Sequence, residues 1–140
     1  MKGLKKLRAF TLIELLLVLV ILAVLASVAV PILAKRLEMA RRNATIAEIS
    51  HMKSALGTFE VDNGRDPTTA EGLLALVQPT AGLENTWAGR YLDKVPLDKW
   101  GHPYIYTCPG TDDPESFDLV SLGADGVAGT DDDINKFTER

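Results

Sequence analysis

The stretch AFTLIELLLVLVILAVLASVAVP, residues 9–31, decides the fold of this 140-residue chain. Most of a charge-free run, residues 15–34, lies within this stretch. The 20 residues of this run are enough to cross the hydrocarbon core of a bilayer as a helix. A secretory signal peptide has a shorter apolar core of about 7–15 residues, so the length favours a retained anchor. Residues 1–8 carry four bases and no acid. Because such basic flanks stay on the cytoplasmic side, the sequence predicts a single-pass membrane anchor whose C-terminal part is exported.

One acid, Glu14, lies inside this apolar run. A carboxylate costs about 2.5–3.5 kcal/mol at the bilayer centre and less near its edge, so its presence points to a positive partner. A cut between Ala9 and Phe10 would create that partner, the free α-amino group of Phe10, and would remove the basic leader, residues 1–9. From the residues alone, a charge tolerated near the interface remains the alternative.

The helical pattern continues beyond the membrane segment. Residues 35–61 contain no proline and one glycine. Their apolar residues recur at three- and four-residue steps, as Ile46, Ile49, Met52, Leu56 and Phe59. The sequence therefore predicts a helix over residues 10–61, with a membrane and assembly segment at 10–34 and an exported continuation at 35–61. Pro31 is expected to kink or locally melt this helix.

The remaining residues, 62–140, are expected to form a compact exported head. Residues 62–64, Asp-Asn-Gly, are a helix-ending signal, and residues 68–77 begin with a capping box that opens a short helix. Strands are expected at residues 104–107 and 117–121, joined by the polar connection CPGTDDPES. Together these elements predict an α+β fold, in which a small antiparallel sheet packs on the apolar stripe of the long helix.

An acidic loop, residues 121–135, contains Asp125 and the run Asp131-Asp132-Asp133 but no Lys or Arg. Adjacent carboxylates repel one another unless a cation or solvent neutralises them. Oxygen ligands on a flexible loop suit Ca²⁺, which takes six to eight of them, better than Mg²⁺ with its strict octahedral geometry. From the residues alone, a solvated acidic loop is an equal alternative to a metal site.

The N-terminal stretch resembles the processing signal of type IV pilins and of the pseudopilins of type II secretion systems. In that superfamily a short basic leader is cut just before a Phe, Glu is the fifth mature residue and Pro the twenty-second. Counted from Phe10, Glu14 is fifth and Pro31 is twenty-second. Ala9 stands where the superfamily normally has glycine.

Two further motifs extend this resemblance over essentially the whole chain. The stretch PLDKWGHPY at residues 96–104 and the tail DGVAGTDDDI at residues 125–134 are similar to those of the major pseudopilins of type II secretion systems. The resemblance implies a pilin-like fold, cleavage by a prepilin peptidase, N-methylation of Phe10, and residence in the bacterial inner membrane with the head in the periplasm. It also implies assembly, through Phe10, Glu14 and Pro31, into a helical periplasmic filament that pushes folded proteins across the outer membrane. The implied partners are further copies of the chain, minor pseudopilins, the peptidase and an inner-membrane assembly platform.

The same resemblance implies a calcium site in the acidic loop. Carried over by position, its ligands are the side chains of Asp125, Asp132 and Asp133 and the backbone carbonyls of Leu122 and Val127. Asp131 falls on a variable position and is expected to be a solvated neighbour. In the preceding motif, Asp98 and Trp100 are expected to fix a loop, with Trp100 buried.

Composition and motifs exclude several other functions. The net charge of −4, without a basic stripe outside the termini, argues against a nucleic-acid partner, and no catalytic motif predicts an enzyme. Two alternatives stay open. One is a type IV pilin for adhesion, motility or DNA uptake, although many of these close a C-terminal loop with a disulfide, which the single Cys108 forbids. The other is a monomeric, membrane-tethered calcium-binding domain.

Overall fold

A computed structural model of the chain describes residues 10–111 and 113–138. These residues belong to two compact units, Met1–Glu38 and Met39–Arg140. The leader, and with it Ala9 of the expected cleavage site, lies outside the described residues.

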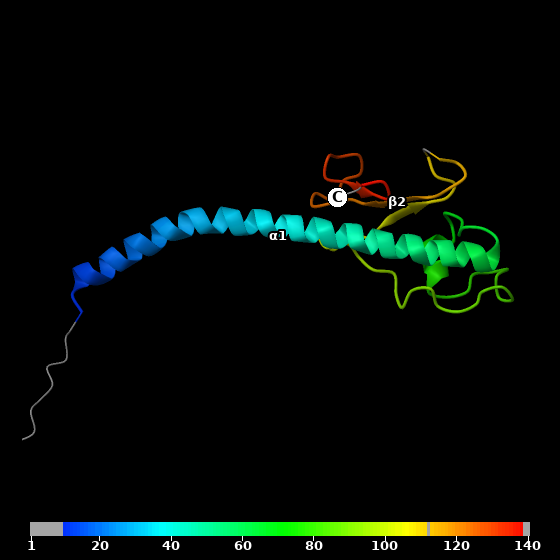
Figure 1. Ribbon diagram of the computed structural model, residues 1–140, viewed down its shortest axis with the longest axis horizontal. Coiled ribbons are helices and arrows are strands. Elements are labelled where there is room, and N and C mark those ends of the chain that lie inside the picture. The colour runs from blue at the N-terminus through cyan, green and yellow to red at the C-terminus, as the bar shows by residue number, and fades with distance from the viewer. Residues whose placement is uncertain (1–9, 112, 139–140) are drawn as a thin grey trace, which may run out of the picture. The chain divides into compact units, whose positions relative to one another are not determined.

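Helix α1, Leu12–Asn63, provides the whole described part of the first unit apart from its first two residues, and it continues into the second (Figure 1). It starts where the Thr11 carbonyl accepts hydrogen bonds from the amides of Glu14 and Leu15, at 3.1 and 3.3 Å. The helix runs through Pro31 without interruption, so of the expected kink or local melting the melting does not occur. A proline removes one intrahelical hydrogen bond, and the cooperative bonds of the neighbouring turns keep the backbone helical.

The end of α1 is as predicted. Gly64 follows the last helical residue with a φ of 72°, and its amide donates to the carbonyl of Glu60 at 2.7 Å. A left-handed glycine just past the end of a helix is a common way to satisfy its last carbonyls.

The predicted capping box also forms. The Thr68 amide donates to Glu71 Oε2 at 2.7 Å, and the Glu71 amide donates to Thr68 Oγ1 at 3.3 Å. The short helix that follows, η1, Gly72–Leu76, is a 3₁₀ helix rather than an α-helix.

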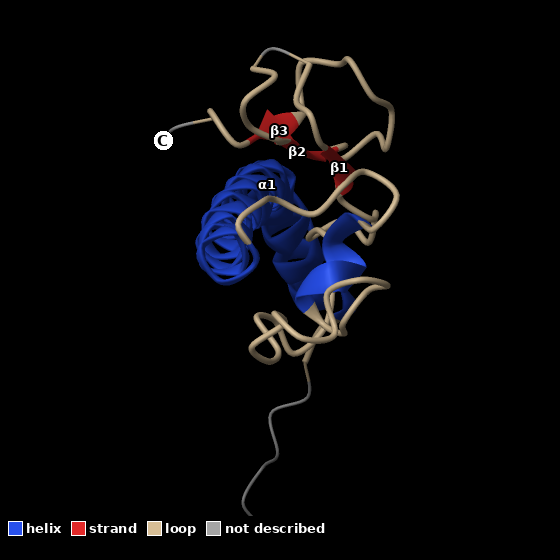
Figure 2. Ribbon diagram, turned by 90° about the vertical axis from the view of Figure 1, so that its right-hand side faces the viewer, coloured by secondary structure: helices blue, strands red, loops and turns tan. Residues whose placement is uncertain are grey.

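Three short strands form one antiparallel sheet in the order β1-β2-β3 (Figure 2). They are β1, Ile105–Thr107, β2, Asp118–Ser121, and β3, Ile134–Asn135. The first two confirm the predicted hairpin, whereas β3 was not predicted. Because β3 pairs with β2, the ends of the acidic loop are held in neighbouring strands.

The core lies between the sheet, η1 and the second half of α1, beside which the strands lie (Figure 1). Of the predicted helix stripe, Ile49, Met52, Leu56 and Phe59 are buried and Ile46 is partly buried. From the sheet and η1, Leu119, Ile134 and Leu76 are fully buried against this stripe. The predicted α+β fold, a long helix packed on a small antiparallel sheet, is confirmed.

Candidate functional site

The first candidate site is the apolar part of α1. It contains a window of 18 residues with a mean hydropathy of 3.1, none of it buried, which is long and apolar enough to cross a membrane. Its large side chains are extensively exposed, from 48% for Val18 to 82% for Leu12. Such a surface requires a bilayer or other protein chains to cover it.

Two of the predicted assembly residues lie at the start of this segment. Phe10 is 74% exposed, and Glu14 occupies the first turn of α1 with its amide capped by Thr11 Oγ1 at 3.3 Å. The first turn is where a helix dipole favours a negative side chain. Within residues 10–111 and 113–138, no base forms an ion pair with Glu14. Among these residues its carboxylate therefore has no positive partner.

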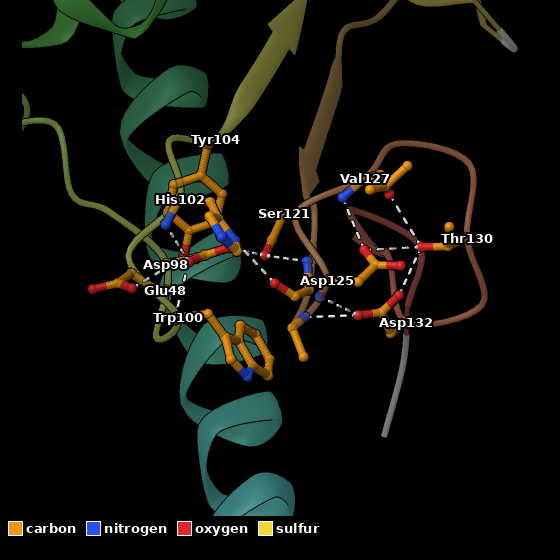
Figure 3. A network of polar contacts seen from close by, with 12 residues as sticks. Glu48, Asp98, Trp100, His102, Tyr104, Ser121, Asp125, Val127, Thr130 and Asp132 are labelled. Atoms are coloured by element: carbon orange, nitrogen blue, oxygen red, sulfur yellow. Dashed lines mark hydrogen bonds and ion pairs between the residues drawn. The ribbon is translucent and has the colours of Figure 1, made fainter.

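The second candidate site is the acidic loop between β2 and β3. Asp132 is its central acceptor (Figure 3): Oδ2 accepts from the amides of Ala124 and Asp125 at 2.6 and 3.1 Å, and Oδ1 accepts from Thr130 Oγ1 at 2.6 Å. The Thr130 hydroxyl, followed by these amides, lowers the pKa of Asp132 below its usual value. The side chain thus holds both limbs of the loop together as an anion.

The other predicted ligands lie in the same loop. Asp125 Oδ1 accepts from the Val127 amide at 2.8 Å, and Asp133 Oδ2 accepts from the Gly129 amide at 2.7 Å. The Leu122 carbonyl accepts from the Gly126 amide at 3.2 Å. The Val127 carbonyl lies 3.1 Å from Thr130 Oγ1, whose single proton is donated to the nearer Asp132 Oδ1.

One carboxylate oxygen in this loop, Asp133 Oδ1, is buried without a hydrogen-bond partner. Burying an unpaired acceptor is costly, and a cation would satisfy it. The potential metal ligands in this loop are carboxylate and carbonyl oxygens, which fit a hard cation such as Ca²⁺. In the part of the chain that the structure describes, however, no three acids, histidines or cysteines are close enough together to hold a metal. The loop therefore contains oxygen ligands of a suitable kind, which would have to move closer together to bind a cation.

A third cluster fixes the segment that precedes β1. The side chain of Asp98 is buried, and its Oδ1 accepts from the amides of Trp100 and His102 at 3.0 and 2.8 Å. Its Oδ2 accepts from Ser121 Oγ at 2.6 Å. The expected loop-fixing role of Asp98 therefore has a structural basis. Trp100 is only partly buried, because it packs against the edge of the core rather than within it.

Glu48 ties this cluster to α1. Its Oε1 accepts from Lys99 Nζ at 2.9 Å and its Oε2 from the Tyr104 hydroxyl at 3.0 Å (Figure 3). Burial, and then the neighbouring Glu48, raise the pKa of Tyr104. Ser121 and His102 had no predicted role; the signal for Ser121 was a polar residue on the inward-facing side of a strand, two positions after Leu119.

A long apolar helix that continues into a small head, with an antiparallel sheet on its second half, defines a pilin-like protein. The family described as type II secretion system protein G matches residues 32–138, and the prokaryotic N-terminal methylation motif matches residues 4–30. The chain belongs to the type II secretion system protein G family.

Individual relatives agree with this assignment. The chain is 41% identical over 131 residues to the type II secretion system core protein G of Aeromonas hydrophila, covering 91% of this chain and 90% of that protein. It is 37% identical over 142 residues to the type II secretion system core protein G of Escherichia coli strain K12, covering 98% of this chain and 95% of that protein. Among solved structures, it resembles the major pseudopilin of the type 2 secretion system of enterohaemorrhagic E. coli, with a TM-score of 0.61 and 32% identity, covering 74% of this chain and 91% of that one.

The prediction of a pseudopilin, a subunit of a type II secretion pseudopilus, is confirmed by these matches. They do not favour the alternatives of a type IV pilin or a monomeric tethered domain. The methylation motif and the exposed apolar helix together support membrane anchoring.

Proposed function

We propose that a prepilin peptidase cuts the chain between Ala9 and Phe10, that Phe10 is then N-methylated, and that the mature subunit polymerises through α1. The observation that carries this proposal is the exposure of the apolar segment of α1, in whose 18-residue window no residue is buried. Before assembly the bilayer covers this surface, and in the filament the same segments of other copies cover it. The role is structural rather than catalytic.

The basic leader sets the orientation of the subunit. Its four bases stay in the cytoplasm, so the head lies in the periplasm of a single-pass inner-membrane protein. An assembly platform in the inner membrane adds the subunit to the filament, and minor pseudopilins complete it. Growth of the filament exports folded proteins through the outer membrane. Pro31 removes one hydrogen bond within the apolar segment and lets α1 adjust to its neighbours.

Glu14 selects the position of each incoming subunit. The α-amino group of a neighbouring Phe10 is a cation at membrane depth. Its partner is the Glu14 carboxylate, which forms no ion pair with any residue that the structure describes. Each charge is costly in an apolar environment unless it meets the other.

Glu14→Gln is therefore expected to insert into the membrane but not to form filaments. Loss of the carboxylate leaves the Phe10 amine of each added subunit uncompensated, which costs about 3–5 kcal/mol. Membrane fractionation measures insertion, and cross-linking ladders together with electron microscopy of sheared material measure filament growth. Glu60→Gln, which removes the same charge from the exported end of α1, is the matched control. Normal filaments from Glu14→Gln would show that the carboxylate is incidental.

We further propose that the acidic loop binds Ca²⁺. Asp125, Asp132 and Asp133, with the carbonyls of Leu122 and Val127, would hold the ion, and the buried, unpartnered Asp133 Oδ1 supports this assignment. When bound, the ion neutralises a loop that contains no base. A ligand that binds only the folded state adds about 2.7 kcal/mol at a concentration one hundred times its dissociation constant.

Calcium is expected to raise the melting temperature of the full-length chain in detergent, and Asp132→Ala is expected to abolish this increase. Asp131→Ala, which removes the neighbouring exposed acid, is expected to keep it. Differential scanning calorimetry with and without chelator measures the increase, and titration calorimetry measures binding. Identical melting curves for the unsubstituted chain, with no heat of binding, would contradict the calcium assignment.

A further inference from the structure

The segment in which the acidic loop leaves β2 is held at a single residue, Gly123. Gly123 is buried and has a φ of 61°. Its amide is bound by the side chain of Ser121, at the start of the loop, and its carbonyl by the side chain of His102, from outside the loop. The Cα of Gly123 faces Asp132.

Ser121 holds the amide side of Gly123. The Gly123 amide donates to Ser121 Oγ at 3.3 Å, and the same hydroxyl donates to Asp98 Oδ2 at 2.6 Å. Ser121 and Asp98 are both buried, so this chain of hydrogen bonds is shielded from water. The position of the Gly123 amide is thus set by the segment that precedes β1.

His102 holds the carbonyl side. Its Nδ1 lies 3.0 Å from the Gly123 carbonyl oxygen, and because a carbonyl can only accept, Nδ1 carries the proton and donates. Asp98 fixes His102 in turn by accepting from its backbone amide at 2.8 Å. The far side of the imidazole contacts Gly126, where an added Cβ would come within 2.9 Å of Nε2.

Asp132 packs against the Cα of Gly123. A Cβ built on Gly123 would lie 2.7 Å from Asp132 Cγ, so only glycine permits this approach. From there the Asp132 carboxylate reaches the amides of Ala124 and Asp125. The backbone of Gly123 is therefore held both by Asp132 and by the Asp98-Ser121-His102 cluster. Figure 3 shows the cluster and Asp132 as two separate groups of side chains.

We propose that His102 and Ser121, both anchored by Asp98, are positioning residues that prepare the acidic loop to bind a divalent cation by fixing Gly123. This inference rests on the proposed calcium function. The Leu122 carbonyl precedes Gly123 directly and the Asp132 carboxylate packs on it, so a shift of Gly123 moves two proposed ligands together. Partners that orient metal ligands in this way typically contribute 10- to 100-fold to affinity.

The test compares His102→Ala with His102→Asn in the full-length chain in detergent. Asn carries a donor nitrogen the same number of bonds from Cα as His Nδ1. We expect His102→Ala to weaken calcium binding by about 10- to 100-fold in titration calorimetry and His102→Asn to restore most of it. His51→Ala, at an exposed position on α1, is the matched control and is expected to bind as the unsubstituted chain does. Unchanged affinity in His102→Ala, or a failure of His102→Asn to restore it, overturns the proposal.

Ser121→Ala provides a second variant should His102→Ala fail to fold, and it is expected to weaken binding in the same way because the Gly123 amide loses its acceptor. Hydrogen exchange in the presence of chelator separates this inference from the calcium function itself. If the unsubstituted chain binds no calcium, the calcium function fails. The positioning role is then tested by the hydrogen-exchange rates of the Ala124 and Asp125 amides. Faster exchange of these amides in His102→Ala than in His51→Ala supports positioning, and equal exchange overturns it.

Discussion

At the residue scale, single carboxylates fix the irregular segments of the head. Glu71 is the clearest case: it accepts from both terminal nitrogens of Arg65 at 2.7 and 2.8 Å, and also from Thr68 and Thr80. The Arg65 guanidinium, with smaller contributions from these threonines, holds the pKa of Glu71 far below its ordinary value. One side chain thereby joins the end of α1 to both sides of η1.

This shift predicts how the head responds to acid. A carboxyl whose pKa is lowered by folding contributes stability that is complete above its unfolded pKa, about 4.3, and is lost progressively as the pH falls below that value toward the folded pKa. Glu71→Gln is therefore expected to melt at a lower temperature than the unsubstituted chain at pH 7, and the difference is expected to shrink as the pH falls below about 4. Thermal unfolding at a series of pH values checks this. Glu84→Gln, in a neighbouring loop, is the control. If the difference in melting temperature between Glu71→Gln and the unsubstituted chain does not change with pH, the ion pair does not contribute as expected.

The acids of the candidate calcium site could be proposed from the sequence because they share one short loop, and the family resemblance singled out Asp125, Asp132 and Asp133 within it. The cluster that positions them could not. Ser121 and Asp98 lie 23 positions apart, and His102 and Gly123 lie 21 apart, so their hydrogen bonds exist only after the sheet has formed. Asp98 was recognised through a sequence motif, which gave no indication of what it binds.

At the element scale, α1 was predictable because one face repeats at helical spacing over many turns. β3 was not, because its two residues are too few to show an alternating pattern. Lys136, just after β3, explains why so short a strand pairs: its buried ammonium donates to Ser116 Oγ at 2.9 Å and to the Phe117 carbonyl. It also lies 4.9 Å from the centres of the Phe117 and Phe137 rings. A single lysine thus anchors the segment just after β3 beside β2.

The stripe on α1 carries the core of the head, and Met52 lies at its fully buried centre. Met52→Ala is expected to lower the free energy of unfolding of the head by about 2–5 kcal/mol, because the lost side chain leaves a cavity. Met39→Ala removes the same side chain from an exposed position of the same helix, where Met39 is 58% exposed. Denaturant unfolding in detergent compares the two variants. Equal effects would mean that the stripe does not form the core.

At the scale of the whole molecule, the two units bury apolar residues in different ways. The head covers its own core, whereas the apolar segment of α1 leaves every described side chain exposed and depends on a membrane or on other copies. This division was predictable from the sequence, because a charge-free run of this length cannot be covered by a head of this size. It explains why one chain can be both a membrane protein and a filament subunit.

The central claim is that the mature chain begins at Phe10 and polymerises through α1. The most direct measurement is the intact mass of the subunit recovered from sheared filaments of cells that contain the prepilin peptidase and the secretion system. The expected mass is that of residues 10–140 with one added methyl group. A chain that still carries residues 1–9, or that is found in the membrane fraction and never in filaments, would contradict the account.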